Sequence, residues 1–249
     1  MLNQVRSKSR TRTEVTEAEL RRAILVGDFL PGSQLPSEAE LINMLNVSRT
    51  TIREALRSLE DDGLVIRRQG VGTFVLERPI LNNFGINYGV TEMIRISKMT
   101  PGVSEFKVTE QPSKENVASQ LSIEPGSMVT VIERVRTANK KPVVYSLDYL
   151  SSTLVSAKDI KIKSKQNFSL YDFLQKEIKI NIGYGVARIT PIKASKKVAK
   201  KLAQEEDAVL LFISQTDYLT EDKPVLHTHE YNLPDAFDYG FLRRRPSNI

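Results

Sequence analysis

The chain has 249 residues, of which 40% are apolar and 27% are charged, a balance typical of a folded globular protein with room for two domains. It contains no cysteine, which excludes disulfide bonds, thiolate catalysis and cysteine-based zinc sites and agrees with a reducing cytoplasm. It also has no long uncharged apolar run and no signal-peptide pattern at its basic N-terminus, so we expect no membrane span and a cytoplasmic protein.

The total charge does not by itself identify a nucleic-acid-binding segment. The chain carries a net charge of +6 and has a pI near 9.4. However, residues 1–78 contain 12 Lys and Arg against 11 Asp and Glu, whereas residues 79–249 contain 24 against 19. The surplus of positive charge lies mainly in residues 79–249. Whether residues 1–78 bind DNA must therefore be judged from where their basic side chains lie, not from the total charge.

Two helices are predicted near the start of the chain. Apolar residues at helical spacing predict the first over residues 13–27, with Thr13 or Thr16 available as its N-cap. Ser37 and Glu40 have the spacing of a capping box and open the second, shorter helix.

A third helix is predicted from Ser48, its N-cap, to about Asp62. At roughly 100° per residue, its apolar residues gather on one side: Ile52, Ala55, Leu56 and Leu59. Its basic and hydroxyl residues gather on another: Arg49, Thr50, Arg53 and Arg57. A helix that follows a tight turn and begins with such residues is typical of the recognition helix of a helix-turn-helix, which enters the major groove of DNA. The alternative is a solvated helix face that nearby glutamates partly neutralise.

A short hairpin is predicted after this helix. Residues 64–69 and 73–75 form its strands, and Gly70 and Gly72 allow a tight turn between them. Such a wing would bring basic and polar side chains close to the flanking DNA backbone or the minor groove, namely Arg67, Arg68 and Gln69. A plain hairpin that completes a small core is the alternative, and both descriptions can hold together.

The segment from Leu20 to Val75 closely resembles the winged helix-turn-helix domain of GntR-type bacterial transcription regulators. The resemblance covers roughly residues 14–76 and rests on PGSQLPSE, VSRTTIREAL and GVGTFV. It implies contacts with operator DNA from the arginines, the neighbouring threonines and the wing tip, although Ala39 stands where many members carry another arginine. The expected DNA-binding residues are Ser37, Ser48, Arg49, Thr50, Thr51, Arg53, Arg57, Arg68, Gln69, Gly70 and Gly72.

Residues 79–89 are rich in turn formers and predict a linker, and the pattern then changes to strands interrupted by short helices. A hairpin is predicted with strands over residues 128–137 and 143–150. Further strands are expected over residues 181–191, 209–218 and 224–231, and three helices are expected to begin at Ser113, Ser169 and Ser195. This order predicts an α+β domain with a mostly antiparallel sheet.

Catalytic and metal-binding patterns are weak in this second segment. We find no glycine-rich phosphate loop and no nucleophile elbow, so catalysis is not supported. His227 and His229 share one face of a predicted strand, but no third ligand has a recognisable spacing and Glu230 points to the opposite face. Arg134 and Arg136 share a strand face, and two guanidinium groups suit a phosphate or a carboxylate unless they are simply solvated.

This region resembles the UTRA effector-binding domain of the HutC subfamily, through GVTEMIR, ERVR followed by a later PV, AKKLA and HEY, over most of residues 90–245. The resemblance implies a fold like that of chorismate lyase, dimerisation through this domain and a small effector that is often a sugar phosphate or a carboxylate. The residues it assigns to the effector are Arg134, Arg136 and Glu230, with Thr91 and Tyr145 as further candidates. Asp148 adds a carboxylate that could reject anions or select an amine.

These features predict an α+β protein with a winged helix-turn-helix domain over residues 1–78, a linker over 79–89 and a chorismate-lyase-like UTRA domain over 90–249, with a mostly antiparallel sheet. We expect a homodimeric repressor that binds double-stranded operator DNA and is controlled by a small effector, without a cofactor or a metal. Two alternatives are an enzyme with a DNA-targeting arm and an architectural DNA binder that responds to no ligand.

Overall fold

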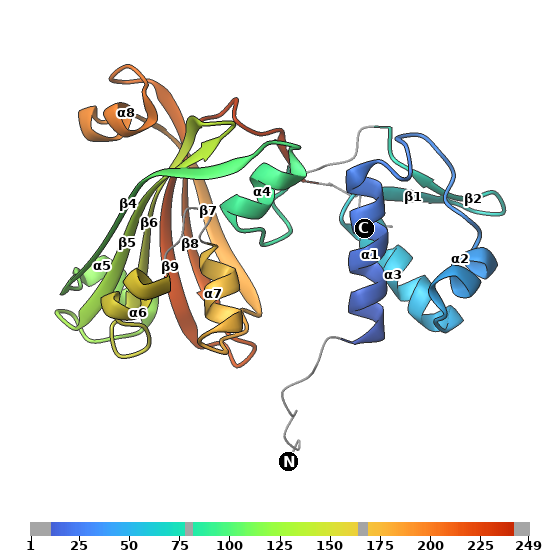
Figure 1. Cartoon of the computed structure of the whole chain (residues 1–249), viewed down its shortest axis with the longest axis horizontal. Coiled ribbons are helices and arrows are strands. Elements are labelled where there is room, and N and C mark those ends of the chain that lie inside the picture. Colours follow the sequence, from blue (N-terminus) through green and yellow to red (C-terminus); the bar gives the residue numbers. More distant parts are fainter. Residues whose placement is uncertain (1–10, 78–81, 164–168, 242–249) are drawn as a thin grey trace, which may run out of the picture. The chain divides into compact units, whose positions relative to one another are not determined.

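The structure, a computed structural model, describes residues 11–77, 82–163 and 169–241 (Figure 1). The chain divides into two compact units: Met1–Ile86 with Asp238–Ile249, and Asn87–Phe237. Among the described residues, no helix combines the length and the apolar character that crossing a membrane requires.

The first unit contains three helices followed by a hairpin. The helices are α1 (Arg12–Val26), α2 (Glu38–Leu45) and α3 (Arg49–Asp61), and the antiparallel strands are β1 (Val65–Arg68) and β2 (Gly72–Val75). Their apolar sides meet in one core, whose large side chains include Leu41, Ile52, Leu56 and Leu59, each at most 1% exposed. Three helices and a two-stranded hairpin around a single core form a winged helix-turn-helix.

The helix starts follow from local hydrogen bonds. In α1 the side chain of Thr11 accepts from the backbone N–H of Glu14, and the Glu14 carboxylate accepts from the Thr11 N–H, so Thr11 is the N-cap. The prediction of Thr13 or Thr16 was therefore wrong, because the capping pair lies earlier in the chain. Ser37 caps α2 and Ser48 caps α3, as the sequence predicted.

The first unit also includes a second, very short sheet. Strand β3 (Asn82–Asn83) pairs in parallel with β10 (Tyr239–Gly240), and the rings of Phe84 and Tyr239 stack at 4.9 Å. This unit therefore contains a strand from the predicted linker and a strand from the end of the predicted second domain. Residues 79–81 of the predicted linker lie outside the described residues.

The second unit is built on a six-stranded sheet in which every neighbouring pair is antiparallel (Figure 1). In spatial order the strands are β4 (Pro101–Pro112), β5 (Met128–Ala138), β6 (Lys141–Ser151), β9 (Pro224–Asn232), β8 (Val209–Tyr218) and β7 (Tyr184–Lys193). The predicted antiparallel α+β fold is confirmed, although β4 had not been predicted as a strand.

Helices cover both faces of this sheet. One face packs against α6 (Ala157–Lys163) and α7 (Leu170–Lys176), and the other packs against α5 (Glu115–Leu121) and α8 (Lys196–Leu202). The remaining helix is α4 (Val90–Ile96). The sequence had not predicted α6, and Ser113 is not the cap of α5, because that helix begins after Lys114 and Ser113 is buried before it.

Candidate DNA-binding surface and effector site

The two sides of α3 differ as the helical periodicity predicted. Ile52, Leu56 and Leu59 are at most 1% exposed, because they pack into the core of the first unit. Arg49, Thr50, Arg53 and Arg57 are exposed on the other side. Arg49 and Arg57 form no ion pair with any described residue, so their guanidinium groups are available to an external anion.

Glu38, the first residue of α2, organises two of the arginines. Its carboxylate accepts from Nε of Arg53 at 2.9 Å and from Nη2 of Arg67 at 2.8 Å. The backbone N–H of Arg67 in turn donates to Glu60 at 3.1 Å. One acid therefore positions two arginines where α2, α3 and β1 meet. Sequence reasoning missed Glu38, although its place in the LPSE motif was a signal.

The hydroxyl groups predicted to contact DNA have partners within the protein. The Oγ of Ser48 accepts from the N–H of Thr51 at 3.1 Å, and their two hydroxyl oxygens share a hydrogen bond of 2.8 Å. The hydroxyl of Ser37 donates to Glu40 at 2.7 Å in the capping box of α2. Ser37, Ser48 and Thr51 therefore hold the helix ends in place, whereas Thr50 is exposed.

The hairpin presents an exposed tip. The guanidinium of Arg68 lies 4.5 Å from the centre of the Phe74 ring, and Gln69 and Gly70 are exposed beyond it. Gly72 has a φ of +143°, and a Cβ atom there would lie 2.4 Å from Nε2 of Gln34, which donates to Val71 O at 3.0 Å. Glycine is therefore needed at position 72 for the Gln34 side chain to brace the wing.

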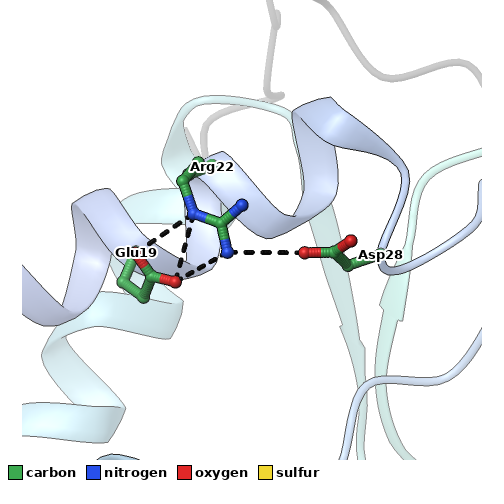
Figure 2. Close-up of polar contacts among 3 residues, drawn as sticks. All are labelled: Glu19, Arg22 and Asp28. Atoms are coloured by element: carbon green, nitrogen blue, oxygen red, sulfur yellow. Dashed lines mark hydrogen bonds and ion pairs between the residues drawn. The ribbon is translucent and has the colours of Figure 1, made fainter.

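Arg22 on α1 provides a contrast with Arg53. Their side chains are 53% and 57% exposed, respectively. Figure 2 shows that Arg22 donates to Glu19 through Nε and Nη2, the shortest of these bonds measuring 2.7 Å, and to Asp28 at 3.4 Å. Two acids therefore neutralise Arg22, whereas Arg53 shares one acid with another arginine. The two side chains are therefore similarly exposed but differ in the number of acids that contact them.

A cluster of polar side chains lies on the sheet face of the second unit that α6 and α7 cover. Directly opposite residues in an antiparallel sheet share a face, and the register aligns Arg134 with Ser146 and Ser146 with Glu230. One row further on, Asp148 is aligned with Thr228. These residues, together with Arg136, bring two arginines and two carboxylates into one region of this face.

Arg134 is already neutralised. Its Nη2 donates to Oδ2 of Asp148 at 2.7 Å, and both side chains are at most 5% exposed. Asp148 also accepts from Oγ1 of Thr228 at 3.1 Å and from Oγ of Ser146 at 3.4 Å. Its carboxylate is therefore surrounded by donors, and the ion pair is a built part of the sheet.

Arg136 is not compensated in this way. It is 2% exposed, it donates through Nη2 to the hydroxyl of Thr91 on α4, and its Nε has no hydrogen-bond partner. Burial, followed by the charge of Arg134, lowers the pKa of Arg136 to about 9. A buried cation with an unsatisfied N–H is a place where an acidic ligand group gains both a charge and a hydrogen bond.

Two further carboxyl groups on this face titrate at unusual pH. Burial, followed by the charge of Asp148, raises the pKa of Glu230 to about 7, and burial raises the pKa of Asp217 to about 6. Asp217 accepts from Asn87, Tyr171 and Gln215 at 2.7–2.9 Å. A pocket of about 310 Å³ adjoins this group and is lined by Asn87, Tyr171, Gln175, Ile180, Asn181, Ile182 and Gly183.

The structure does not bring Tyr145 together with the other residues predicted to bind the effector. Tyr145 lies between Val144 and Ser146 on β6, so strand alternation turns it to the opposite face, where its hydroxyl donates to Glu133 at 2.8 Å. His227 and His229 lie on that opposite face too, with their Nε2 atoms 3.1 Å apart. Burial lowers the pKa of His227 to about 4, so this pair is neutral at pH 7.

Two family descriptions match the sequence. "Bacterial regulatory proteins, gntR family" matches residues 12–75, and "UTRA domain" matches residues 97–238, which is more than half of the chain. The chain belongs to the GntR family. It is of the type in which a UTRA domain follows the helix-turn-helix, as the sequence resemblance predicted.

Its relatives in this family are regulators. NagR of Bacillus subtilis (strain 168), an HTH-type transcriptional repressor, is 28% identical over 221 residues, which cover 89% of this chain and 90% of NagR. A probable fructoselysine utilization operon transcriptional repressor of Escherichia coli (strain K12) is 30% identical over 209 residues, which cover 81% of this chain and 82% of that protein.

The fold is shared with a solved structure, that of the possible transcriptional regulator YydK from Bacillus subtilis subsp. subtilis str. 168. The TM-score is 0.69 at 20% identity, over 95% of this chain and 100% of YydK. This GntR protein is thus a DNA-binding transcription regulator and not an enzyme, and its UTRA domain binds a small-molecule effector.

Proposed function

We propose that this GntR regulator is a homodimeric repressor that inserts α3 of each subunit into the major groove of an inverted-repeat operator. The observation that carries the proposal is the division of α3, whose apolar side is fully buried while its arginines stay exposed. A dimer with two-fold symmetry reads two half-sites that are one or more helical turns apart.

Individual residues have distinct roles in this proposal. Arg49, Arg53 and Arg57 contact base edges and phosphates, and Arg68 and Gln69 at the wing contact the flanking backbone or the minor groove. Glu38 is a positioning residue, because it holds the guanidinium groups on α3 and β1 without touching DNA itself.

The test begins with selection of tight-binding duplexes from a random library by the full chain, followed by affinity measurements at several salt concentrations. Arg53→Ala should weaken binding to the selected duplex by about 1–3 kcal/mol. Arg22→Ala, the matched control, removes an equally exposed but neutralised arginine and should change the affinity little. Equal affinities for wild type and Arg53→Ala at every salt concentration would remove Arg53 from the interface.

We infer that the effector carries an acidic group, such as a phosphate or a carboxylate, which Arg136 holds with help from Thr91. The unsatisfied Nε of buried Arg136 supports this assignment. Effector control requires that the ligand bind the DNA-free state more tightly than the DNA-bound state. A thermal-shift screen of acidic metabolites should find compounds that stabilise the wild type but not Arg136→Met, and that also lower its affinity for the selected duplex. Failure of the whole screen would favour a ligand-independent DNA binder.

Homodimerisation is supported by the sheet face that carries α5 and α8. Aromatic and histidine side chains on this face stay only half-buried: Tyr149, Phe212, His229 and Tyr231. Sedimentation of the full chain should give the mass of a dimer, and Phe212→Lys should give a monomer, because an unpaired charge cannot be buried in an apolar interface. A dimeric Phe212→Lys protein would exclude this face as the interface.

A further inference from the structure

The buried cluster on the sheet face differs from a simple anion site in its charge balance. It contains two guanidinium groups, Arg134 and Arg136, and two carboxyl groups, of which Asp148 is buried and Glu230 is partly buried. Asp217 lies further along the same face. A site that only had to bind a phosphate would not need acids next to the arginines. The acids therefore restrict which charges a bound ligand can carry, and their positions on the sheet determine this restriction.

Only one of the two arginines is available to a ligand anion. Asp148 lies 2.7 Å from Arg134 and holds two further donors, so a ligand anion at Arg134 would have to displace it or lie beside its charge. Arg136 has a hydroxyl partner and an unsatisfied Nε, and can take an acidic group without breaking an ion pair. The geometry therefore accommodates one acidic group and disfavours two.

The acids on the neighbouring strands form the other end of the site. Glu230 is aligned with Ser146 on β6, which is itself aligned with Arg134 on β5, so one strand separates the acidic and basic sides. Arg136 lies one row further along β5, and because neighbouring strands are about 4.8 Å apart and residues of one face about 6.8 Å apart along a strand, the backbones of Arg136 and Glu230 lie about 12 Å from each other. Burial and the charge of Asp148 raise the pKa of Glu230 more than the two arginines lower it, so a cationic ligand group beside this carboxyl would favour its ionised form.

We propose that the effector is a zwitterion, whose single acidic group is held by Arg136 and whose ammonium group is held by Glu230, with Asp148 excluding a second acidic group. This assignment deepens the proposed effector site and rests on it. A ligand with one charge of each sign leaves the buried cluster as neutral as before, whereas a plain anion adds a charge that the acids repel. The distance between the two sides favours a ligand whose charges are several bonds apart.

The experiment uses the full chain and probes that share a carbon skeleton. 6-Aminohexanoate is compared with hexanoate and hexylamine, and O-phosphoethanolamine with ethyl phosphate, by thermal shift and calorimetry at pH 7. The zwitterion of each set should bind the wild type about tenfold more tightly than its matched anion, a difference of about 1.4 kcal/mol. Glu230→Gln keeps the size of the side chain and should abolish this preference.

A second variant tests the role of Asp148. Asp148→Asn should increase the affinity for inorganic phosphate about tenfold, because the charge that opposes a dianion is gone. Because this change leaves Arg134 without its counter-charge and can lower stability, Glu230→Gln remains the primary variant, and circular dichroism verifies that both are folded.

The outcomes separate this inference from the proposed effector site. If the matched anions bind the wild type as tightly as the zwitterions, and Arg136→Met abolishes that binding, the effector site stands and the zwitterion is refuted. Equal phosphate affinities of wild type and Asp148→Asn would refute the role of Asp148. Binding of no probe by any of these proteins would count against both the zwitterion and the acidic-ligand assignment, and would leave DNA binding untouched.

Discussion

Replacing either of two arginines on the same strand should change the stability of the protein in opposite directions. Arg134 and Arg136 are both buried on β5 and face the same side, but Arg134 has the Asp148 carboxylate at 2.7 Å, whereas Arg136 donates to the uncharged hydroxyl of Thr91. Burial lowers the pKa of Arg136 to about 9, more than three units below the ordinary value for arginine. At about 1.4 kcal/mol per unit, keeping this charge inside the protein costs on the order of 4–5 kcal/mol.

Arg136→Met replaces the aliphatic part of the side chain by a similar apolar chain and removes the guanidinium group with its charge. We expect its free energy of unfolding to exceed that of the wild type by about 1–3 kcal/mol, since replacing a poorly compensated buried charge by an apolar side chain recovers only part of the cost. Arg134→Met is the matched control, and it should lower the free energy of unfolding by about 3–5 kcal/mol because it leaves Asp148 buried without a counter-charge.

Urea unfolding of the full chain, followed by circular dichroism at pH 7, measures both variants under the same conditions. A destabilised Arg136→Met protein would show that the guanidinium group supports the fold, and the argument that it is kept for a ligand would be refuted. A gain in stability together with loss of the effector response is the combination that a binding residue predicts.

Three further changes test other parts of the structure. Glu230→Gln should flatten the pH dependence of the unfolding free energy. Because the folded protein raises the pKa of Glu230 to about 7, this carboxyl does not oppose folding below pH 4.5 and lowers the free energy of unfolding by about 3 kcal/mol as the pH rises to 7, so parallel curves for the two proteins would contradict the assignment. Ser48→Ala removes the N-cap of α3 and should cost the first unit about 1 kcal/mol in urea unfolding, whereas an unchanged midpoint would mean that the cap is replaced by water. Gly72→Ala places a Cβ atom against the Gln34 side chain at a φ of +143° and should lower the free energy of unfolding by about 1–3 kcal/mol. Adding Gln34→Ala should relieve the steric contact but not the backbone strain, so the double variant should recover only part of this loss. Full recovery of the stability would show that the backbone at position 72 carries no strain.

Local patterns were sufficient for much of the DNA-binding unit. Ser37 with Glu40, and Ser48 before Arg49, specify two helix starts because an N-cap acts on the backbone N–H groups of the next three residues. The side of α3 that is buried follows from helical periodicity in the same way. In the second unit, strand alternation alone placed His227 with His229 and turned Glu230 to the opposite face.

The tertiary structure decided which side chains meet across distant segments. Glu38 lies between Arg53 and Arg67, and Asp148 faces Arg134, only because separate elements pack together in a particular register. The separation of Tyr145 from Arg134 has the same origin, since the sequence predicted the strand of Tyr145 but not that the register would align Arg134 with its neighbour Ser146.

The sequence by itself therefore determined the family, the two kinds of domain and the polar side of each helix and strand, because these depend on interactions within a few residues. The charge balance of the effector site, in contrast, depends on the tertiary structure. Hydrogen bonding between strands far apart in the chain sets the register, and the register determines which acid lies beside which arginine.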